Sequence, residues 1–307
     1  MKPTLNVHSL LQKLKPVLPD SGIVIMNSEA KLTPSFKLPK PKVTILDNDD
    51  LRSRDNVQQF IAYKEKLVLE KDEAADIERL TRGQHTNAIW HDVRCGRLTS
   101  SNFGAIQIRK CTTEPDNLVK RIMGYVSMPD KVETRWGREH EPAARRKYFI
   151  TMGKTHPHIT VGQCGLIIDK DRPYLAASPD GLVDCPDCKP QQGVLEIKCP
   201  HKWRNNTVEE ATSNPDFCCI KDKGTVQIKK SHAYYYQVQG QMGITGRKWC
   251  DFVVWTLKDM FIQRIEFDPL LWEEMKTKLE KFFVEGVVPE IFTNRIERGI
   301  PLYTHVH

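Results

Sequence analysis

The stretch SPDGLVDCPDCKPQQGVLEIKCP, residues 178–200, decides the fold. It places Asp180 behind a proline, then a turn-rich interval, then Glu196 and Lys198 separated by one apolar residue. Short apolar runs separated by turn signals such as PDCKPQQG predict neighbouring strands. Strands are poor in Asp, Glu and Lys, so these three residues call for a reason other than strand formation.

The period of a strand gives that reason, because side chains two residues apart point to the same face. Glu196 and Lys198 then share one face, while Leu195 and Ile197 point into an apolar layer. In a hairpin, Asp180 would lie beside Glu196. Two close carboxylates repel unless a cation lies between them, and Mg²⁺ binds carboxylates, waters and phosphate. The pattern indicates metal-assisted phosphodiester hydrolysis; the alternative is a solvated surface hairpin with an outward salt bridge.

The rest of the chain predicts an α/β fold, more closely an α+β mixed sheet flanked by helices. Helical periodicity, caps and apolar runs mark the elements. Helices are expected within 56–80, up to Gly96, from Thr99–Asn102 onward, and over 136–153, 231–245 and 271–287. Strands are expected over 164–171, 174–183, 193–200, 249–259 and 261–268.

Composition bounds the domains and the partners. We expect a disordered, Pro-rich tail over 1–55, a helical N-terminal extension over 56–87 and one folded domain over 88–307. The net charge of +7 favours a polyanionic partner, nucleic acid first. Nine scattered cysteines, no export signal and no membrane-length apolar run indicate an intracellular protein with reduced thiols and no membrane partner.

A family resemblance becomes specific at this point. The pair PD at 179–180 and ExK at 196–198 matches the PD-(D/E)xK nuclease core, a restriction-endonuclease-like fold. The longer strings SPDGL and LEIKCP resemble the phage lambda exonuclease and YqaJ-type viral recombinase family. Three further blocks match in the right order across residues 88 to 285: WHDVRCGRLTSSNFG, WGREHEPAAR and AYYYQVQGQM.

The resemblance implies roles for the acidic residues. Asp180 and Glu196 would bind the metal directly, and the Ile197 carbonyl would add a third ligand. Glu141 would complete the acidic cluster, with Glu139 as a rival on a different face of the same helix. Lys198 would position or activate the attacking water, and Gln237 would bond a catalytic water or a ligand carboxylate. The implied cofactor is Mg²⁺, for which Mn²⁺ can substitute.

The resemblance also implies a 5′-phosphate anchor, because a guanidinium and hydroxyl groups suit phosphate oxygens. The matched positions are Arg94, Ser101, Ser178 and Arg204. Each has an ordinary alternative: a surface ion pair for Arg94, a helix cap for Ser101 and a loop charge for Arg204. The tyrosines at 234–236 could stack on bases, although core packing is favoured for at least two of them.

The activity that the resemblance implies is a Mg²⁺-dependent exonuclease that digests duplex DNA from 5′-phosphorylated ends, 5′ to 3′, for recombination or end processing. A strand-annealing protein is the implied partner and a homotrimer the implied assembly. Two alternatives stay open: an endonuclease for branched DNA or specific sites, and a catalytically silent DNA-binding module. The expected compartment is the nucleus or cytoplasm of a eukaryote, or the cytoplasm of a bacterium or phage host.

The segment CPDC at 185–188 has the spacing of metal ligands. A structural zinc needs further ligands, and no second CxxC or HxxxH lies near it in the sequence. The pair Cys218–Cys219 is the only nearby candidate. The pattern therefore does not favour structural zinc, and it predicts a variable hairpin loop instead.

Overall fold

The computed structural model describes residues 36–110, 112–126 and 131–303. Its helices are α3 (Arg54–Glu65), α4 (Lys71–Leu80), α5 (Ala88–Arg94), α6 (Ser100–Gln107), α7 (Asp116–Ile122), α8 (Val132–Gly153), α9 (Val208–Ala211), α10 (Ala233–Thr245), α11 (Pro269–Phe282) and α12 (Val288–Thr293). The 3₁₀ turns η3 (Gln84–Thr86) and η4 (His201–Trp203) and the π-helical turn η5 (Phe283–Val287) complete the set.

The strands form three sheets. The main sheet has the order β10 (Met260–Glu266), β9 (Trp249–Trp255), β6 (Gln192–Lys198), β5 (Gly181–Asp184) and β2 (Thr160–Gly162). Its β6–β9 pair is parallel and the other three pairs are antiparallel. A second sheet joins β1 (Leu98–Thr99), β4 (Leu175–Ala177) and β3 (Ile167–Ile168), and a hairpin joins β7 (Cys219–Asp222) and β8 (Thr225–Ile228).

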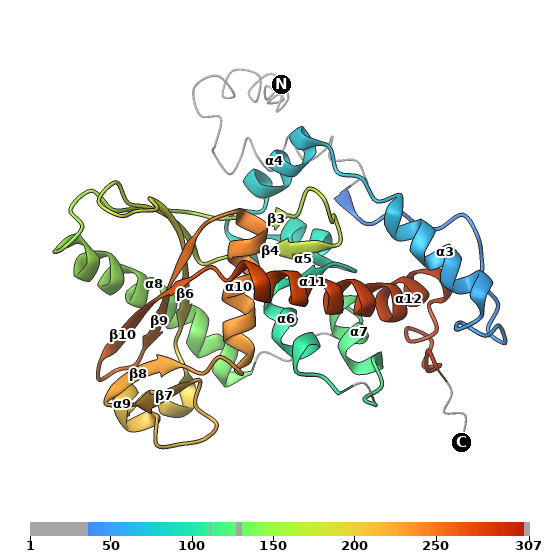
Figure 1. The fold of residues 1–307 in the computed structure, drawn as a ribbon. Coiled ribbons are helices and arrows are strands. Elements are labelled where there is room, and N and C mark those ends of the chain that lie inside the picture. The colour runs from blue at the N-terminus through green and yellow to red at the C-terminus, as the bar shows by residue number, and fades with distance from the viewer. Residues whose placement is uncertain (1–35, 111, 127–130, 304–307) are drawn as a thin grey trace, which may run out of the picture.

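Helices cover both faces of the main sheet, as the sequence predicts for a mixed α/β fold (Figure 1). On one face, Ala144 and Tyr148 of α8 pack against Leu195 and Ile197 of β6. On the other, Val238 and Met242 of α10 pack in one core cluster with Val194 of β6 and with Phe252 and Val254 of β9. The strand period therefore sends Glu196 and Lys198 toward α10, as expected.

A second, helical core lies beside the sheet (Figure 1). It is built by α3, α6, α7, α11 and α12, with Phe103, Leu279 and Phe283 buried inside it. The close approach of α6 to α10 depends on Gly104, because a Cβ there would lie 2.4 Å from the Ala233 backbone. This contact holds the middle of α6 next to the start of α10.

Two expectations about element boundaries need correction. We expected the helix with Pro142 to begin near Trp136, but α8 begins at Val132 and carries Pro142 inside it. Stacking of Trp136 on His140, at 3.6 Å between ring centroids, lies in the early turns of this helix. The expected strand over 174–183 is two strands, because β4 and β5 belong to different sheets and Asp180 lies between them.

Part of the segment expected to be a disordered tail is ordered. Residues 1–35 lie outside the described residues, but Ile45 and Leu51 are buried in the helical core. The Arg295 guanidinium donates to the backbone carbonyls of Leu46, Asp47 and Asp49. The Ser53 side chain caps α3. The 56–87 segment is helical, in α3, α4 and η3, while the division into domains stays a prediction.

Candidate active site

The β5–β6 hairpin brings the predicted acidic residues together. Gly181 pairs with Leu195, so Asp180 enters the sheet opposite Glu196. The Ile197 backbone N–H donates to the Asp180 carboxylate at 2.6 Å. Ile197 thus contacts Asp180 through its backbone N–H, whereas the resemblance implied that its carbonyl binds the metal. The antiparallel register therefore places the Asp180 and Glu196 carboxylates at the same edge of the sheet, where β5 begins and β6 ends.

Glu196 is buried and accepts from three side chains. Its Oε1 accepts from Lys198 Nζ and from Gln237 Nε2, both at 2.6 Å, and its Oε2 accepts from Gln241 Nε2 at 2.7 Å. Glu196 is 3% exposed, so the alternative of an outward, solvated salt bridge is wrong. A buried carboxylate persists only with such partners, since hydrogen bonds to charged groups contribute about 1.5–3 kcal/mol each.

Lys198 lies within this cluster as a cation. Its ammonium group also donates to Gln237 Oε1 at 3.2 Å and lies 4.3 Å from the centroid of the Tyr234 ring. Burial opposes the charged form, but the Glu196 carboxylate more than offsets it and raises the pKa of Lys198. Lys198 therefore carries its proton at neutral pH.

The charged form of Asp180 is disfavoured in this cluster. Burial, then the charge of Glu196, then the charge of Glu141 raise the pKa of Asp180 well above its usual value, against the lowering effect of Lys198. Such a carboxyl gains most from a nearby cation.

Glu141 reaches this cluster through Arg145, one helical turn along α8. The Arg145 guanidinium donates to Glu141 Oε1 at 3.1 Å and also to the Asp180 backbone carbonyl. Glu139, the rival, is exposed. The geometry therefore favours Glu141 over Glu139 as the acidic residue that α8 contributes.

Three of the four predicted phosphate-binding residues lie together near Asp180. Arg94 Nη2 is 3.4 Å from Ser101 Oγ and 3.2 Å from Thr99 Oγ1. The Arg94 guanidinium stacks 3.9 Å from the centroid of the Trp90 ring, and Trp90 Nε1 donates to Ser178 Oγ at 3.0 Å. Ser178 precedes Asp180 by two residues, so the arginine cluster borders the acidic one.

Arg94 lacks a counter-ion within the described part of the chain, where no carboxylate pairs with it. Burial lowers the pKa of Arg94 to about 10, so the guanidinium is still charged at neutral pH. A half-buried, unpaired cation beside hydroxyl groups can bind an anion.

Arg204, the fourth predicted anchor, has different contacts. Its Nη1 donates to the His201 carbonyl at 2.9 Å, and its guanidinium lies 5.9 Å from the centroid of the Trp136 ring. No contact joins it to Arg94, Ser101 or Ser178 among the interactions of the described residues. The structure therefore places Arg204 beside Trp136 of α8 and His201 of η4.

Sequence reasoning missed three contributors to the site: Trp90, Arg145 and Gln241. Gln241 follows Gln237 by four residues, so both lie on one face of α10, and that spacing could have identified it. The matched block AYYYQVQGQM also contains Gln239, which forms a Gln-x-Gln pair with Gln237. Gln239 donates to the Glu266 carbonyl and accepts from the Asp268 N–H, away from Glu196.

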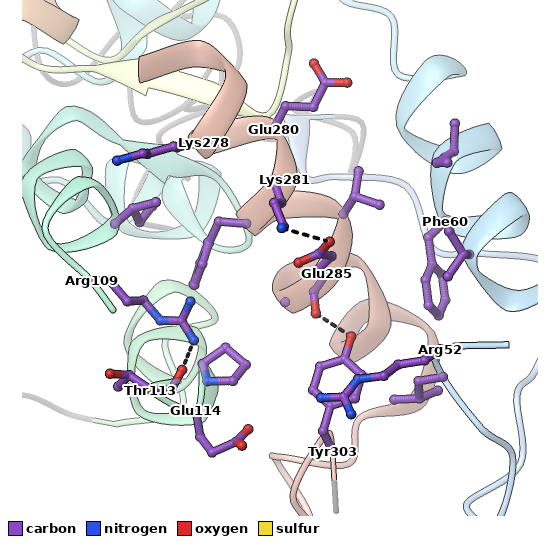
Figure 2. Close-up of a pocket in the computed structure, with 18 of the residues that line it drawn as sticks. Arg52, Phe60, Arg109, Thr113, Glu114, Lys278, Glu280, Lys281, Glu285 and Tyr303 are labelled. Atoms are coloured by element: carbon purple, nitrogen blue, oxygen red, sulfur yellow. Dashed lines mark hydrogen bonds and ion pairs between the residues drawn. The ribbon is translucent and has the colours of Figure 1, made fainter. Parts of the chain in front are cut away.

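A pocket of about 1050 Å³ lies elsewhere, between α3, the segment that precedes α7, α11 and η5 (Figure 2). Figure 2 shows Arg52, Arg109, Lys278 and Lys281 among its lining residues. None of the predicted site residues lines it. The charged groups singled out from the sequence therefore converge at the hairpin and not at this pocket.

The sequence pattern of the YqaJ-like viral recombinase domain matches residues 89–248, more than half of the chain. The chain belongs to this family. It is also 27% identical over 186 residues to the alkaline nuclease of Orgyia pseudotsugata multicapsid polyhedrosis virus. That match covers 55% of this chain and only 40% of the relative's length.

Solved structures resemble the chain as well. An alkaline exonuclease (LHK-Exo) from Laribacter hongkongensis is 29% identical, with a TM-score of 0.48 over 67% of this chain and 94% of that one. The shutoff and exonuclease protein of Kaposi's sarcoma-associated herpesvirus is 11% identical, with a TM-score of 0.43 over 95% and 88%. In the described residues, no helix is both long and apolar enough to span a membrane.

Proposed function

We propose that this chain is a Mg²⁺-dependent deoxyribonuclease that hydrolyses duplex DNA from 5′-phosphorylated ends, in the 5′ to 3′ direction. The observation that carries the proposal is the position of Asp180, crowded by Glu196 and Glu141 at the strand end where Lys198 supplies a cation. Family membership and the alkaline nuclease relative support a nucleic-acid substrate.

The donor set suits magnesium. Asp180, Glu196 and Glu141 offer hard carboxylate oxygens, and the repulsion that raises the pKa of Asp180 would be relieved by a divalent cation. Asp180 and Glu196 would hold the ion, with Glu141 completing the acidic set. When bound, Mg²⁺ supplies Lewis-acid stabilisation of phosphate charge and favours ionisation of water.

The protein side chains then have separate tasks. Lys198 carries its proton, so it serves as a hydrogen-bond donor to water or phosphate oxygen and not as a general base. Gln237 bonds both Lys198 and Glu196 and fixes their relative positions. Gln241 orients the other oxygen of Glu196.

The arginine cluster supports the preference for a phosphorylated end. Arg94 and Ser101 would hold the terminal phosphate, and Ser178 would add a hydroxyl donor beside them. Because Ser178 precedes Asp180 by two residues, an anchored terminal phosphate would lie close to the carboxylates. A first nucleotide held in this way would be cleaved from the 5′ end.

One experiment tests the activity and its end dependence. Linear duplex with 5′ phosphate, linear duplex with 5′ hydroxyl and sealed circular duplex are incubated with the protein and Mg²⁺. We expect fast digestion of the phosphorylated duplex, slower digestion of the hydroxyl form and none of the circle. Equal cutting of the circle would make the protein an endonuclease, and no cutting of any substrate would leave a DNA-binding module.

Family membership supports two finer proposals, a strand-annealing protein as partner in recombination and a homotrimer as the assembly. Light scattering of the purified protein, alone and with a short duplex, checks the assembly. A trimeric mass is expected, and a monomeric mass under both conditions would overturn it.

A further inference from the structure

Three side chains with metal-ligand chemistry meet at the far end of the β5–β6 hairpin. Cys185 and Cys188 lie in the turn between the two strands, and His156 follows the end of α8. Their ligand atoms all lie within 4.8 Å of one another, and His156 Nδ1 is 3.7 Å from each sulfur. Within the described ranges, this is the one group of three or more His, Cys, Asp or Glu residues with that spacing.

The turn that carries the cysteines directs backbone donors at a sulfur. The Cys188 N–H donates to the Cys185 carbonyl at 3.0 Å, which closes a tight turn. The backbone N–H groups of Asp187 and Cys188 donate to the Cys185 sulfur. Backbone N–H donors favour the thiolate, which is the form that binds metal.

The second sulfur has a donor of its own. The Arg264 guanidinium donates to Cys188 Sγ at 3.1 Å. Arg264 is held by two hydrogen bonds to Asp251, at 2.8 and 2.9 Å, and stacks 3.7 Å from the centroid of the Trp249 ring. The buried Asp251 also accepts from Tyr148 at 2.7 Å. Such supporting donors orient and stabilise metal-bound thiolates.

The alternatives explain less of this arrangement. Cys185 and Cys188 are 0% and 6% exposed, so they have little contact with water. A disulfide between them would account for two sulfurs but not for an imidazole nitrogen equally distant from both. The Cys218–Cys219 pair, the partner considered from sequence, lies in the core on the opposite face of the sheet. The neighbour that the sequence reasoning left out is His156.

We propose that His156, Cys185 and Cys188 bind a zinc ion that fastens the end of α8 to the β5–β6 hairpin. Two thiolates and an imidazole are a soft ligand set that selects zinc over magnesium. No fourth His, Cys, Asp or Glu of the described residues joins the group, so a water molecule would supply the fourth ligand. The site does not depend on the proposed nuclease activity.

The location indicates a structural role. Helix α8 carries Glu141 near one end of the hairpin and leads to His156 at the other end. Between them, Ala144 and Tyr148 pack on Val183, Leu195 and Ile197. A zinc ion would hold the far end of this unit in place, while the near end carries the acidic residues.

The first test counts metal in the full-length protein. The protein is produced with zinc supplied, purified under reducing conditions and analysed by mass spectrometry for bound metals. We expect about one zinc per chain, and the same content in Asp180→Asn, which separates this site from the acidic one. Replacement with cobalt should give the thiolate-to-cobalt absorption and the strong visible bands of a tetrahedral site.

Matched variants locate the ion. Cys188→Ser and His156→Asn should lose zinc and the cobalt spectrum, whereas Cys95→Ser and His158→Ala should keep both. Should the first pair fail to fold, the metal content and cobalt spectrum of the unaltered protein still decide. Folded, reduced protein without zinc, a Cys185–Cys188 disulfide, or zinc retained in Cys188→Ser would overturn the proposal.

Discussion

The β5–β6 hairpin and helix α8 contribute residues to two clusters, one at each end of the hairpin, and the two clusters contain different kinds of metal ligand. The carboxylate end consists of Asp180, Glu196 and Glu141, and the thiol end of His156, Cys185 and Cys188. At the carboxylate end, amide and ammonium groups from α10 and β6 satisfy Glu196, yet Asp180 remains crowded by negative charge. At the thiol end, all three ligand atoms already lie within 4.8 Å.

This difference separates a site that would perform chemistry from one that would hold structure. Repulsion among carboxylates is unfavourable without a cation, so the carboxylate end gains stability when it binds one. At the thiol end, N–H donors contact both sulfurs and both cysteines lie in an apolar cluster. The hairpin and α8 thus carry hard ligands at one end and soft ligands at the other, and four experiments test this contrast.

The largest expected effect is at Asp180. Asp180→Asn keeps the shape of the side chain but removes the charge that would hold the metal. We expect the rate of DNA cleavage to fall at least about 100-fold, the scale on which lost stabilisation of transition-state charge is felt. Gel assays measure the rate, and circular dichroism checks the fold. The exposed Asp222→Asn serves as control, and an unchanged rate in Asp180→Asn would remove Asp180 from the metal-binding set.

The next effect concerns the end of the DNA. Arg94→Ala should lower the ratio of rates on 5′-phosphorylated and 5′-hydroxyl duplex by at least about tenfold, because one charged hydrogen bond to phosphate contributes about 1.5–3 kcal/mol. Arg204→Ala, whose guanidinium bonds the His201 carbonyl, should leave that ratio close to the original. A lowered ratio in Arg204→Ala alone would reverse the assignment.

A smaller effect should separate two glutamines of α10. Gln241→Leu removes one of three donors to Glu196, so kcat should fall about fivefold, equivalent to roughly 1 kcal/mol. Gln239→Leu removes contacts with Glu266 and Asp268 and should lower Tm with little change in kcat. Steady-state kinetics and thermal melts distinguish the two. Equal losses of kcat would mean that Gln241 acts only through stability.

The experiment with the smallest expected effect compares the two ends in protein from which metal has been removed. Zn²⁺ should raise Tm by about 4–8 °C, or roughly 2 kcal/mol at about 2–4 °C per kcal/mol, through the thiol end. Mg²⁺ should restore DNA cleavage with a smaller change in Tm, through the carboxylate end. Calorimetry and the cleavage assay check each ion. The contrast fails if Mg²⁺ reproduces the shift in Tm caused by Zn²⁺.

Local patterns in the sequence predicted much of the architecture and of the acidic cluster. The two-residue period placed Glu196 and Lys198 on one face, and the hairpin placed Asp180 opposite Glu196. The hydroxyl at Thr99 and the serines after it predicted a helix start, where α6 begins at Ser100. These features depend on neighbours in the chain or on a short turn, so the sequence contains the needed information.

What the sequence alone determined is therefore the β5–β6 hairpin with its charged face and the helices that flank it. Which side chains from distant elements contact that hairpin could be seen only in the tertiary structure. Gln241 comes from α10, Trp90 links Arg94 to Ser178, and His156 meets cysteines 29 and 32 residues farther along. Their positions follow from how α8 and α10 pack on the sheet, which no local periodicity encodes.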